Sequence, residues 1–264
     1  VYWATVFLDC VAEDFIQKGK NIPGLEKAVR FTEKSRALGL GTLGFHTYLQ
    51  DRMIPFDSME AHFVNQEIFG HLHDESLRAS KWLARTKGEP EWCKGYGVRN
   101  THRTAVAPNT TSALMCGAVS QGIEPVYKNI YSQGSSVGEI VRINPSLIRL
   151  MKAKGIYDPE HVDAIINADG SIQGNPAFTP EEQHVFRTAF EIPQEALIRL
   201  ASSRQRKLCQ AQSLNLFFSA DEDPRVISRI HKLAFKDPYI FSLYYIRSLA
   251  GVKGSNGECA ACEG

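Results

Sequence analysis

The amino-acid sequence predicts an α/β fold. Stretches with the composition of strands alternate along the chain with stretches that carry helix signals, which favours an α/β architecture over separate all-α and all-β domains. The chain has 264 residues, of which 43% are hydrophobic, and this is enough for a sizeable core. From 249 onward Gly, Ser and Asn dominate and leave little to bury. We therefore expect a folded body over residues 1–248 and a flexible tail over 249–264.

The first predicted elements are a helix and a buried strand. The opening segment, VYWATVFLDCVAEDFI, resembles the middle of an apolar helix and lacks an initiator methionine, so we expect the chain to be a piece of something longer. The strand is expected within residues 35–49, where Gly39, Gly41 and Gly44 stand among apolar residues. Glycines in a strand favour a close approach of the backbone to a neighbour.

A long helix follows in the prediction. Asp57 and Glu60 form a capping-box pattern at its start, and Gly88 is expected to end it. Apolar residues at helical spacing fall near one face of this helix: Val64, Ile68, Leu72, Ala79 and Leu83.

The later elements continue the alternation. Residues 101–115 indicate a strand followed by a turn, and residues 137–155 indicate a strand that runs into a helix. Two more helices are predicted where a capping residue precedes a proline at the first helical position, at Thr179 and at Asp223.

Composition and charge exclude several classes of protein. Lys and Arg number 30 against 29 Asp and Glu, so nothing in the charge favours a nucleic acid or a membrane as the partner. No apolar run approaches the roughly 20 residues of a membrane-spanning helix, and we expect a cytoplasmic protein. The six cysteines lack the dense spacing of a secreted disulfide scaffold, so most should be reduced.

A polar segment between apolar flanks is a candidate phosphate site. It places an amide and three hydroxyl side chains behind a proline: Pro108, Asn109, Thr110, Thr111 and Ser112. These groups and their backbone N–H groups could surround a phosphate, especially where a helix N-terminus follows. An ordinary turn with a helix cap is the alternative. Glu124, beside Pro125, indicates a fixed loop next to the same site or a plain turn.

Two cysteines near the end of the sequence have redox spacing. Cys259 and Cys262 form a CxxC pair, which can act as a dithiol that exchanges with another disulfide. A structural zinc site would need four ligands, and no second pair with suitable spacing accompanies this one. His71 and His73 point apart on the predicted helix. We predict no metal site and interpret the pair as an electron carrier.

Adjacent tyrosines stand in an apolar stretch. Tyr244 and Tyr245 would point to opposite faces of a regular strand, with one ring buried and the other exposed. A radical relay would require both rings in contact, and then the backbone must leave regular strand geometry here.

The order of these motifs resembles the catalytic large subunit of class I ribonucleotide reductase. The segments RALGLGTLGF, RNTHRTAVAPNTTS, GIEP, AQSLNLFF, LYYIRS and CAAC follow one another along essentially the whole chain. The likeness is Ia-like, with phage-type members as the expected nearest group. It implies that this chain is the C-terminal half of the large subunit and supplies the second half of a ten-stranded α/β barrel.

The resemblance also implies roles for individual residues. The loop of residues 108–112 would hold the diphosphate of a ribonucleoside diphosphate substrate. Tyr244 would lie next to the active-site thiol, and Tyr245 would be its stacked neighbour toward the radical-generating small subunit. Cys259 and Cys262 would reduce the active-site disulfide after each turnover and then accept electrons from thioredoxin or glutaredoxin.

Further implied components lie outside this chain. The radical cysteine, the active-site disulfide and the ATP or dNTP effector sites belong to the N-terminal half of the large subunit. This chain binds no cofactor in this interpretation, and a dimetal-tyrosyl radical cofactor is expected in the small subunit. Two alternatives remain open. A cobalamin-dependent class II reductase would need no tyrosine pair, and a non-catalytic fragment would bind only phosphate or a partner chain.

Overall fold

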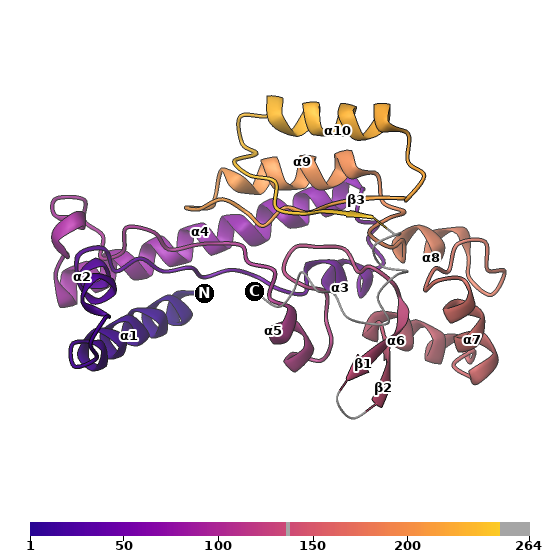
Figure 1. Cartoon of the computed structure of the whole chain (residues 1–264), viewed down its shortest axis with the longest axis horizontal. Helices are drawn as coiled ribbons and strands as arrows, with labels where there is room; N and C mark the ends of the chain where they lie inside the picture. Colours follow the sequence, from indigo (N-terminus) through magenta and orange to yellow (C-terminus); the bar gives the residue numbers. More distant parts are fainter. Residues whose placement is uncertain (136–137, 249–264) are drawn as a thin grey trace. The chain divides into compact units, whose positions relative to one another are not determined.

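The computed structural model describes residues 1–135 and 138–248, and these form two compact units (Figure 1). The first unit contains Val1–Gly41, Val64–Ala107 and Ser202–Gln212. The second contains Thr42–Phe63, Pro108–Ala201 and the segment that begins at Ser213.

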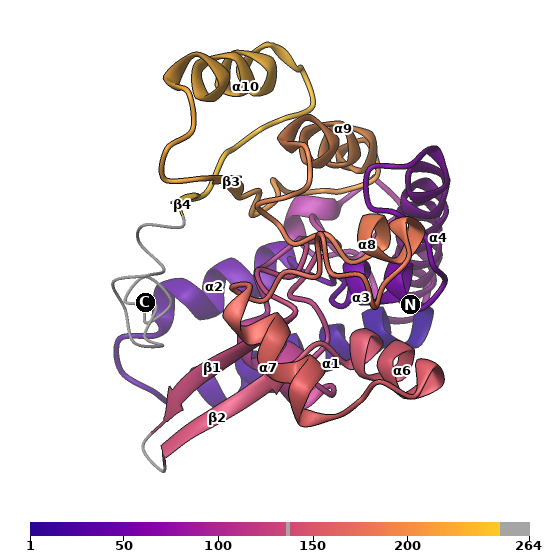
Figure 2. The same ribbon diagram turned by 90° about the vertical axis from the view of Figure 1, so that its right-hand side faces the viewer.

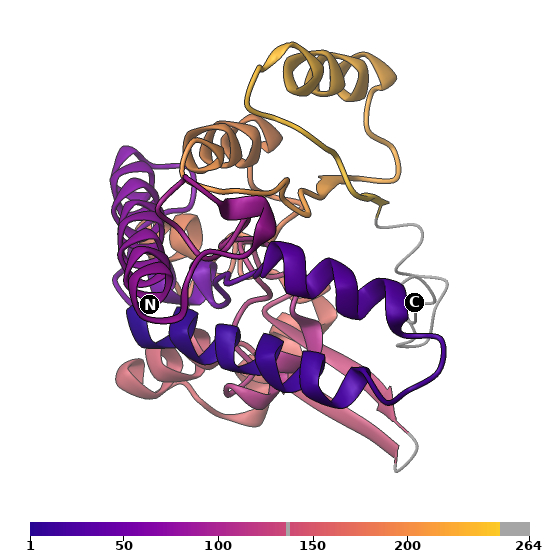
Figure 3. The ribbon, with the colours of Figure 1, turned by 90° about the vertical axis from the view of Figure 1, so that its left-hand side faces the viewer.

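The first unit opens with the predicted helix. Helix α1 (Tyr2–Gly19) lies beside α2 (Glu26–Ser35) in Figures 1 and 3, and the short 3-10 helix η1 (Glu91–Cys93) also contacts α2. Asp9 is buried on α1, where its carboxylate accepts hydrogen bonds from Arg99 Nε at 2.9 Å and from Asn100 Nδ2 at 3.0 Å.

The strand expected within residues 35–49 is reduced to a short extended segment, so that prediction was wrong in extent. Only Leu40 forms a bridge, which is parallel, with Thr104. The glycine prediction is confirmed at Gly41, because a Cβ atom there would collide with the backbone carbonyl oxygen of Ala105.

The chain turns into helix α3 (Phe45–Gln50) where the sequence pattern had suggested that the strand continues. Gly44 adopts a φ of 77°, which glycine reaches without strain, and stands at the helix N-cap. Phe45 and Leu49 are then one helical turn apart and both buried, so burial favours the helix over the strand.

The long helix α4 spans Met59–Lys87, and Gly88 ends it with a φ of 83°, as predicted. The predicted capping residue was wrong by one position. Ser58, and not Asp57, accepts the hydrogen bond from the backbone N–H of Ala61, at 3.0 Å. On the predicted face of α4, the side chains of Leu72, Ala79 and Leu83 are buried. Those of Val64 and Ile68 are half-buried.

The strand and turn expected over residues 101–115 are also corrected. Within the described residues, Thr104 and Val106 form isolated parallel bridges in place of a strand. The expected turn is a short helix, α5 (Thr110–Met115), whose N-cap Asn109 is left-handed with a φ of 58°.

The second unit holds an antiparallel hairpin, seen in Figures 1 and 2. Strand β1 (Ile130–Ser135) pairs with β2 (Gly138–Ile143), and β2 runs into helix α6 (Pro145–Lys154) as predicted. The N-cap Asn144 of α6 accepts from the backbone N–H of Ser146. Helix α7 (Pro159–Asn167) follows. A core cluster joins these elements: Ile130, Leu147, Met151, Ile165, Ile172, Phe178, Val185 and Phe186.

Helix α8 (Pro180–Val185) begins with the predicted cap. The Thr179 hydroxyl accepts from the Glu182 N–H at 3.2 Å, and the Glu182 carboxylate accepts from the Thr179 N–H at 2.7 Å. Helix α9 (Gln194–Gln205) comes next along the chain.

A strand, a helix and a parallel strand complete the described chain. Strand β3 (Leu216–Phe218) pairs in parallel with β4 (Ile246–Ser248), and helix α10 (Pro224–Lys236) connects them. The predicted cap Asp223 accepts from the N–H of Arg225 at 2.8 Å. A second cluster packs these elements on α9: Ile198, Leu216, Phe218, Ile230 and Ala234. Among the described helices, none is long and apolar enough to cross a membrane.

Candidate functional site

The two adjacent tyrosines are in direct contact in the second unit, just before β4. Their ring centroids are 4.1 Å apart with an interplanar angle of 49°. The Tyr245 hydroxyl donates a hydrogen bond to the Tyr244 hydroxyl at 3.3 Å. Tyr244 is 52% exposed and Tyr245 is half-buried. The backbone therefore leaves regular strand geometry here, as the relay hypothesis requires.

A buried asparagine supports the backbone of this pair. Asn215 precedes β3 and is 1% exposed. Its side-chain Oδ1 accepts from the backbone N–H of Tyr245 at 2.9 Å, while its Nδ2 donates to Glu124 Oε1 at 2.5 Å. Both ends of the amide are thus satisfied by hydrogen bonds, as a buried polar group requires.

The carboxyl group of Glu124 is itself buried, with 5% of the residue exposed. Besides the bond from Asn215, its Oε2 accepts from the Tyr127 hydroxyl at 3.0 Å. Burial raises the pKa of Glu124 to about 7, although the bonds from Tyr127 and Asn215 and the charge of Arg247 act in the opposite direction. Glu124 can therefore hold or release a proton near neutral pH.

An arginine cation lies against two of these aromatic rings. The guanidinium carbon of Arg247 stands 5.0 Å from the ring centroid of Tyr127 and 5.4 Å from that of Tyr245. Tyr127 also contacts Phe217 of β3, with centroids 5.5 Å apart. Cation–π contacts at these distances favour one fixed arrangement of the rings.

The candidate phosphate loop lies in the same unit. Asn109 Nδ2 donates to the Thr42 carbonyl at 3.4 Å, and the Thr110 hydroxyl donates to Gln121 Oε1 at 3.1 Å. Thr111 and Ser112 are exposed in the first turn of α5. Two of the predicted hydroxyls are thus presented to solvent, and the third anchors the loop. Pro108, at the start of the loop, is half-buried.

One short segment connects the loop with the tyrosine pair. The side chain of Gln121 accepts a hydrogen bond from the Thr110 hydroxyl. The backbone carbonyl of Gln121 accepts a hydrogen bond from the Glu124 N–H at 2.8 Å. Glu124 then contacts Asn215, which holds Tyr245. Glu124 therefore stands in a turn that its own N–H closes, and this turn is joined to the loop through Gln121, while a role beside a phosphate site stays a prediction.

The predicted dithiol lies outside the described residues, since Cys259 and Cys262 fall within 249–264. The cysteines that the structure describes are free thiols: Cys10, Cys93, Cys116 and Cys209.

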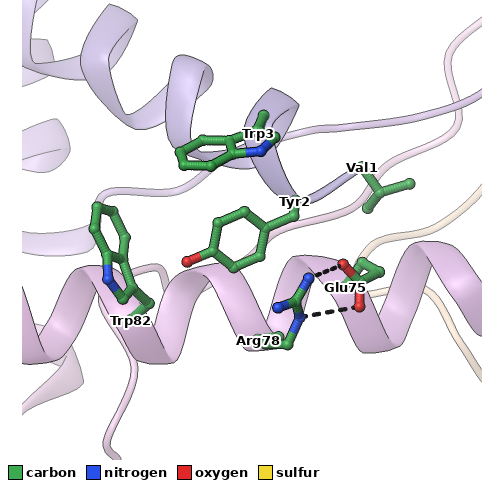
Figure 4. A pocket seen from close by; sticks show the side chains of 6 residues that line it. All are labelled: Val1, Tyr2, Trp3, Glu75, Arg78 and Trp82. Carbon is green, nitrogen blue, oxygen red and sulfur yellow. Dashed lines mark hydrogen bonds and ion pairs between the residues drawn. The ribbon is translucent and has the colours of Figure 1, made fainter.

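An open pocket of about 500 Å³ lies in the first unit, between the start of α1 and α4 (Figure 4). Tyr2, Trp3 and Trp82 provide its aromatic lining. The guanidinium of Arg78 lies 4.4 Å from the Tyr2 ring centroid and is bound to the Glu75 carboxylate. None of the described predicted site residues lines this pocket.

Sequence reasoning missed the residues that connect the site. These residues are Gln121, Tyr127 and Asn215, and none of them was predicted to belong to the site. Asn215 carried a usable signal, because it is a single amide in the apolar run SLNLFF, where a buried polar group needs a partner.

The sequence matches the family described as ribonucleotide reductase, barrel domain, over residues 1–96 and 90–245. A protein of Frog virus 3 (isolate Goorha) is 38% identical over 97% of this chain and 47% of its own length. The ribonucleoside-diphosphate reductase large subunit of Invertebrate iridescent virus 3 is 36% identical over 98% of this chain and 43% of its own length.

A solved structure shows the same fold. The class Id ribonucleotide reductase alpha subunit of Actinobacillus ureae superposes with a TM-score of 0.86 at 39% identity, over 93% of this chain and 45% of that one. The chain thus spans about half the length of these relatives. The resemblance to class I large subunits and the α/β barrel fold are confirmed, while the phage-type assignment stays a prediction. The chain therefore belongs to the ribonucleotide reductase barrel-domain family.

Proposed function

We propose that this chain is part of the catalytic large subunit of a ribonucleotide reductase, which converts ribonucleoside diphosphates to 2′-deoxyribonucleoside diphosphates by radical chemistry. The observation that carries the proposal is the contact between Tyr244 and Tyr245, with their hydroxyls 3.3 Å apart. Ordinary core packing on a strand does not bring neighbouring rings together. The large-subunit names of the relatives support the same activity.

In this proposal the tyrosine pair transfers an unpaired electron. When Tyr245 has lost an electron and its phenolic proton, the Tyr244 hydroxyl supplies both and restores Tyr245. The radical then resides on Tyr244, from which it would pass to a thiol elsewhere in the large subunit. Each hydroxyl can donate or accept, so the same contact serves the return step.

The loop of residues 108–112 would bind the substrate diphosphate. The exposed hydroxyls of Thr111 and Ser112 and the free N–H groups at the start of α5 can donate to phosphate oxygens. Thr110 would fix the loop through Gln121 and not contact the substrate itself.

The remaining parts of the proposal concern partners. Cys259 and Cys262 would carry electrons from thioredoxin or glutaredoxin to the active-site disulfide. The N-terminal part of the large subunit would supply that disulfide and the effector sites, and a small subunit with a dimetal-tyrosyl cofactor would generate the radical. We propose a cytoplasmic location for this assembly.

The test replaces each tyrosine by phenylalanine in the complete large subunit, assembled with its small subunit. Tyr244→Phe and Tyr245→Phe keep the rings and delete the hydroxyls, so product formation should stop even with dithiothreitol as reductant. Tyr157→Phe is the matched control, since Tyr157 is also partly exposed and contacts the Lys152 ammonium in place of another tyrosine. Normal turnover by both variants of the pair would refute the radical path.

A further inference from the structure

The contact between the two tyrosine rings originates in the backbone. In a regular parallel ladder, the residue whose carbonyl accepts from Leu216 also donates its own N–H to Leu214. Here the carbonyl belongs to Tyr245, at 2.9 Å from the Leu216 nitrogen, whereas the N–H that reaches the Leu214 carbonyl, at 2.8 Å, belongs to Tyr244. Two residues thus stand opposite Asn215, which is the pattern of a β-bulge.

The bulge has two consequences. It places neighbouring side chains on one side, so that the rings meet at 4.1 Å. It also directs the N–H of Tyr245 to a side chain in place of a ladder carbonyl. The Oδ1 atom of Asn215 accepts a hydrogen bond from that N–H, so this side chain replaces the ladder bond.

An asparagine amide can do this in only one of its two orientations. If the amide of Asn215 rotated by half a turn, its NH₂ group would face the Tyr245 N–H, and two donors would meet in a buried place. Glu124 selects the productive orientation, because its Oε1 accepts from Asn215 Nδ2. The Tyr127 hydroxyl in turn holds the other carboxyl oxygen of Glu124.

We propose that Glu124 is a positioning residue for the tyrosine pair, acting through Asn215 to hold the bulge that brings the two rings into contact. The inference rests on the proposed function and extends it to a residue that touches neither ring. Misplacement of reacting groups by about 1 Å can lower a rate by about 100-fold. We therefore expect Glu124→Ala to lower kcat by about this factor in the assembled reductase, with KM for the diphosphate changed less than about twofold.

Conservative replacement separates positioning from charge. Glu124→Gln retains an oxygen that accepts from Asn215 Nδ2, so it should recover most of the rate lost in Glu124→Ala. Asn215→Leu removes the acceptor for the Tyr245 N–H and should lose activity like Glu124→Ala. Because Glu124 acts on the tyrosine pair only through Asn215, the double variant Glu124→Ala with Asn215→Leu should be no slower than the slower of the two single variants.

Two further measurements guard against a merely structural effect. Glu191→Ala is the matched control, because this carboxylate also accepts hydrogen bonds in the second unit, from Thr188 N–H and the Ser171 hydroxyl, outside the network. Its kcat should stay near wild type. With 3-aminotyrosine at position 244, which receives the radical across the ring contact, electron paramagnetic resonance should show a lower yield of trapped radical in Glu124→Ala than in the control.

The outcomes distinguish the inference from the proposed function. If Tyr245→Phe is inactive while Glu124→Ala keeps the wild-type kcat, the inference is wrong and the proposed function stands. Equal losses in Glu124→Ala and Glu124→Gln, or additive losses in the double variant, would also overturn it. If Tyr245→Phe turns over normally, the radical path itself fails and the positioning role falls with it.

Discussion

Replacing Glu124 by Gln removes a titrating group while keeping its size and one acceptor oxygen. Burial raises the pKa of this carboxyl group to about 7 from an ordinary value of 4.5. The folded protein therefore keeps the proton over a pH range in which the unfolded chain has released it. The stability that the neutral carboxyl contributes is fully present below pH 4.5 and is lost as the pH rises through 7.

The magnitude follows from the difference between these two pKa values. At about 1.36 kcal/mol per unit, the difference corresponds to about 3 kcal/mol of folding free energy. Urea denaturation of the protein that contains this chain, from about pH 4 to about pH 8, measures it. The free energy of unfolding of the wild type minus that of Glu124→Gln should fall by about 3 kcal/mol over this range.

Glu182→Gln provides a control of opposite sign. Burial acts to raise the pKa of Glu182, but hydrogen bonds from Lys154 and from the Thr179 N–H give a net lowering. Its contribution to stability is present above the unfolded pKa of 4.5 and is lost as the pH falls. The free energy of unfolding of the wild type minus that of Glu182→Gln should therefore increase with rising pH. Parallel curves for the wild type and Glu124→Gln would refute the argument from burial.

Three other predictions concern the loop, the dithiol and a close backbone contact. Thr111→Val combined with Ser112→Ala should weaken diphosphate binding by about 1.5–3 kcal/mol per lost hydrogen bond, measured as a higher KM, and an unchanged KM would return the segment to an ordinary turn. Cys259→Ser or Cys262→Ser should stop multiple turnover with thioredoxin but not with dithiothreitol, and failure of that rescue would contradict the carrier role. Gly41→Ala should lower the thermal midpoint by roughly 5 °C or more, because its methyl group meets a backbone carbonyl, and an unchanged midpoint would show that the segment can shift.

The helix starts that depend on neighbouring residues were predictable. Thr179 and Asp223 cap their helices as expected, because a capping side chain and a following proline act within one turn. Asp57 failed because Ser58, also a good capping residue, stands beside it, and local chemistry does not decide between them. The strand expected over residues 35–49 failed because apolar residues around glycines suit a short extended segment and a helix equally well.

The sequence indicated the loop of residues 108–112 and the tyrosine pair as parts of the site, but it did not indicate the residues that connect them. The residues alone indicated that Tyr244 and Tyr245 point to opposite faces of a strand, and only the family resemblance implied that their rings meet. Neither showed what would bend the backbone. That information resides in the pairing of Asn215 with Glu124, which are 91 positions apart in the sequence. The residues around Asn215 and around Glu124 form no local pattern that predicts their contact, so the hydrogen bond between them is seen only in the folded structure.

Because of the bulge before β4, the contact between the two tyrosine rings depends on the number of residues in this segment more than on the chemistry of their side chains. A tyrosine analogue with a different oxidation potential can occupy either position without changing the hydrogen bonds that hold the backbone. Loss of a single residue there would restore the regular alternation of side chains and separate the rings. In this chain, an aromatic substitution at either position should therefore leave the backbone in place, whereas an insertion or deletion between Leu243 and Ile246 should abolish the ring contact.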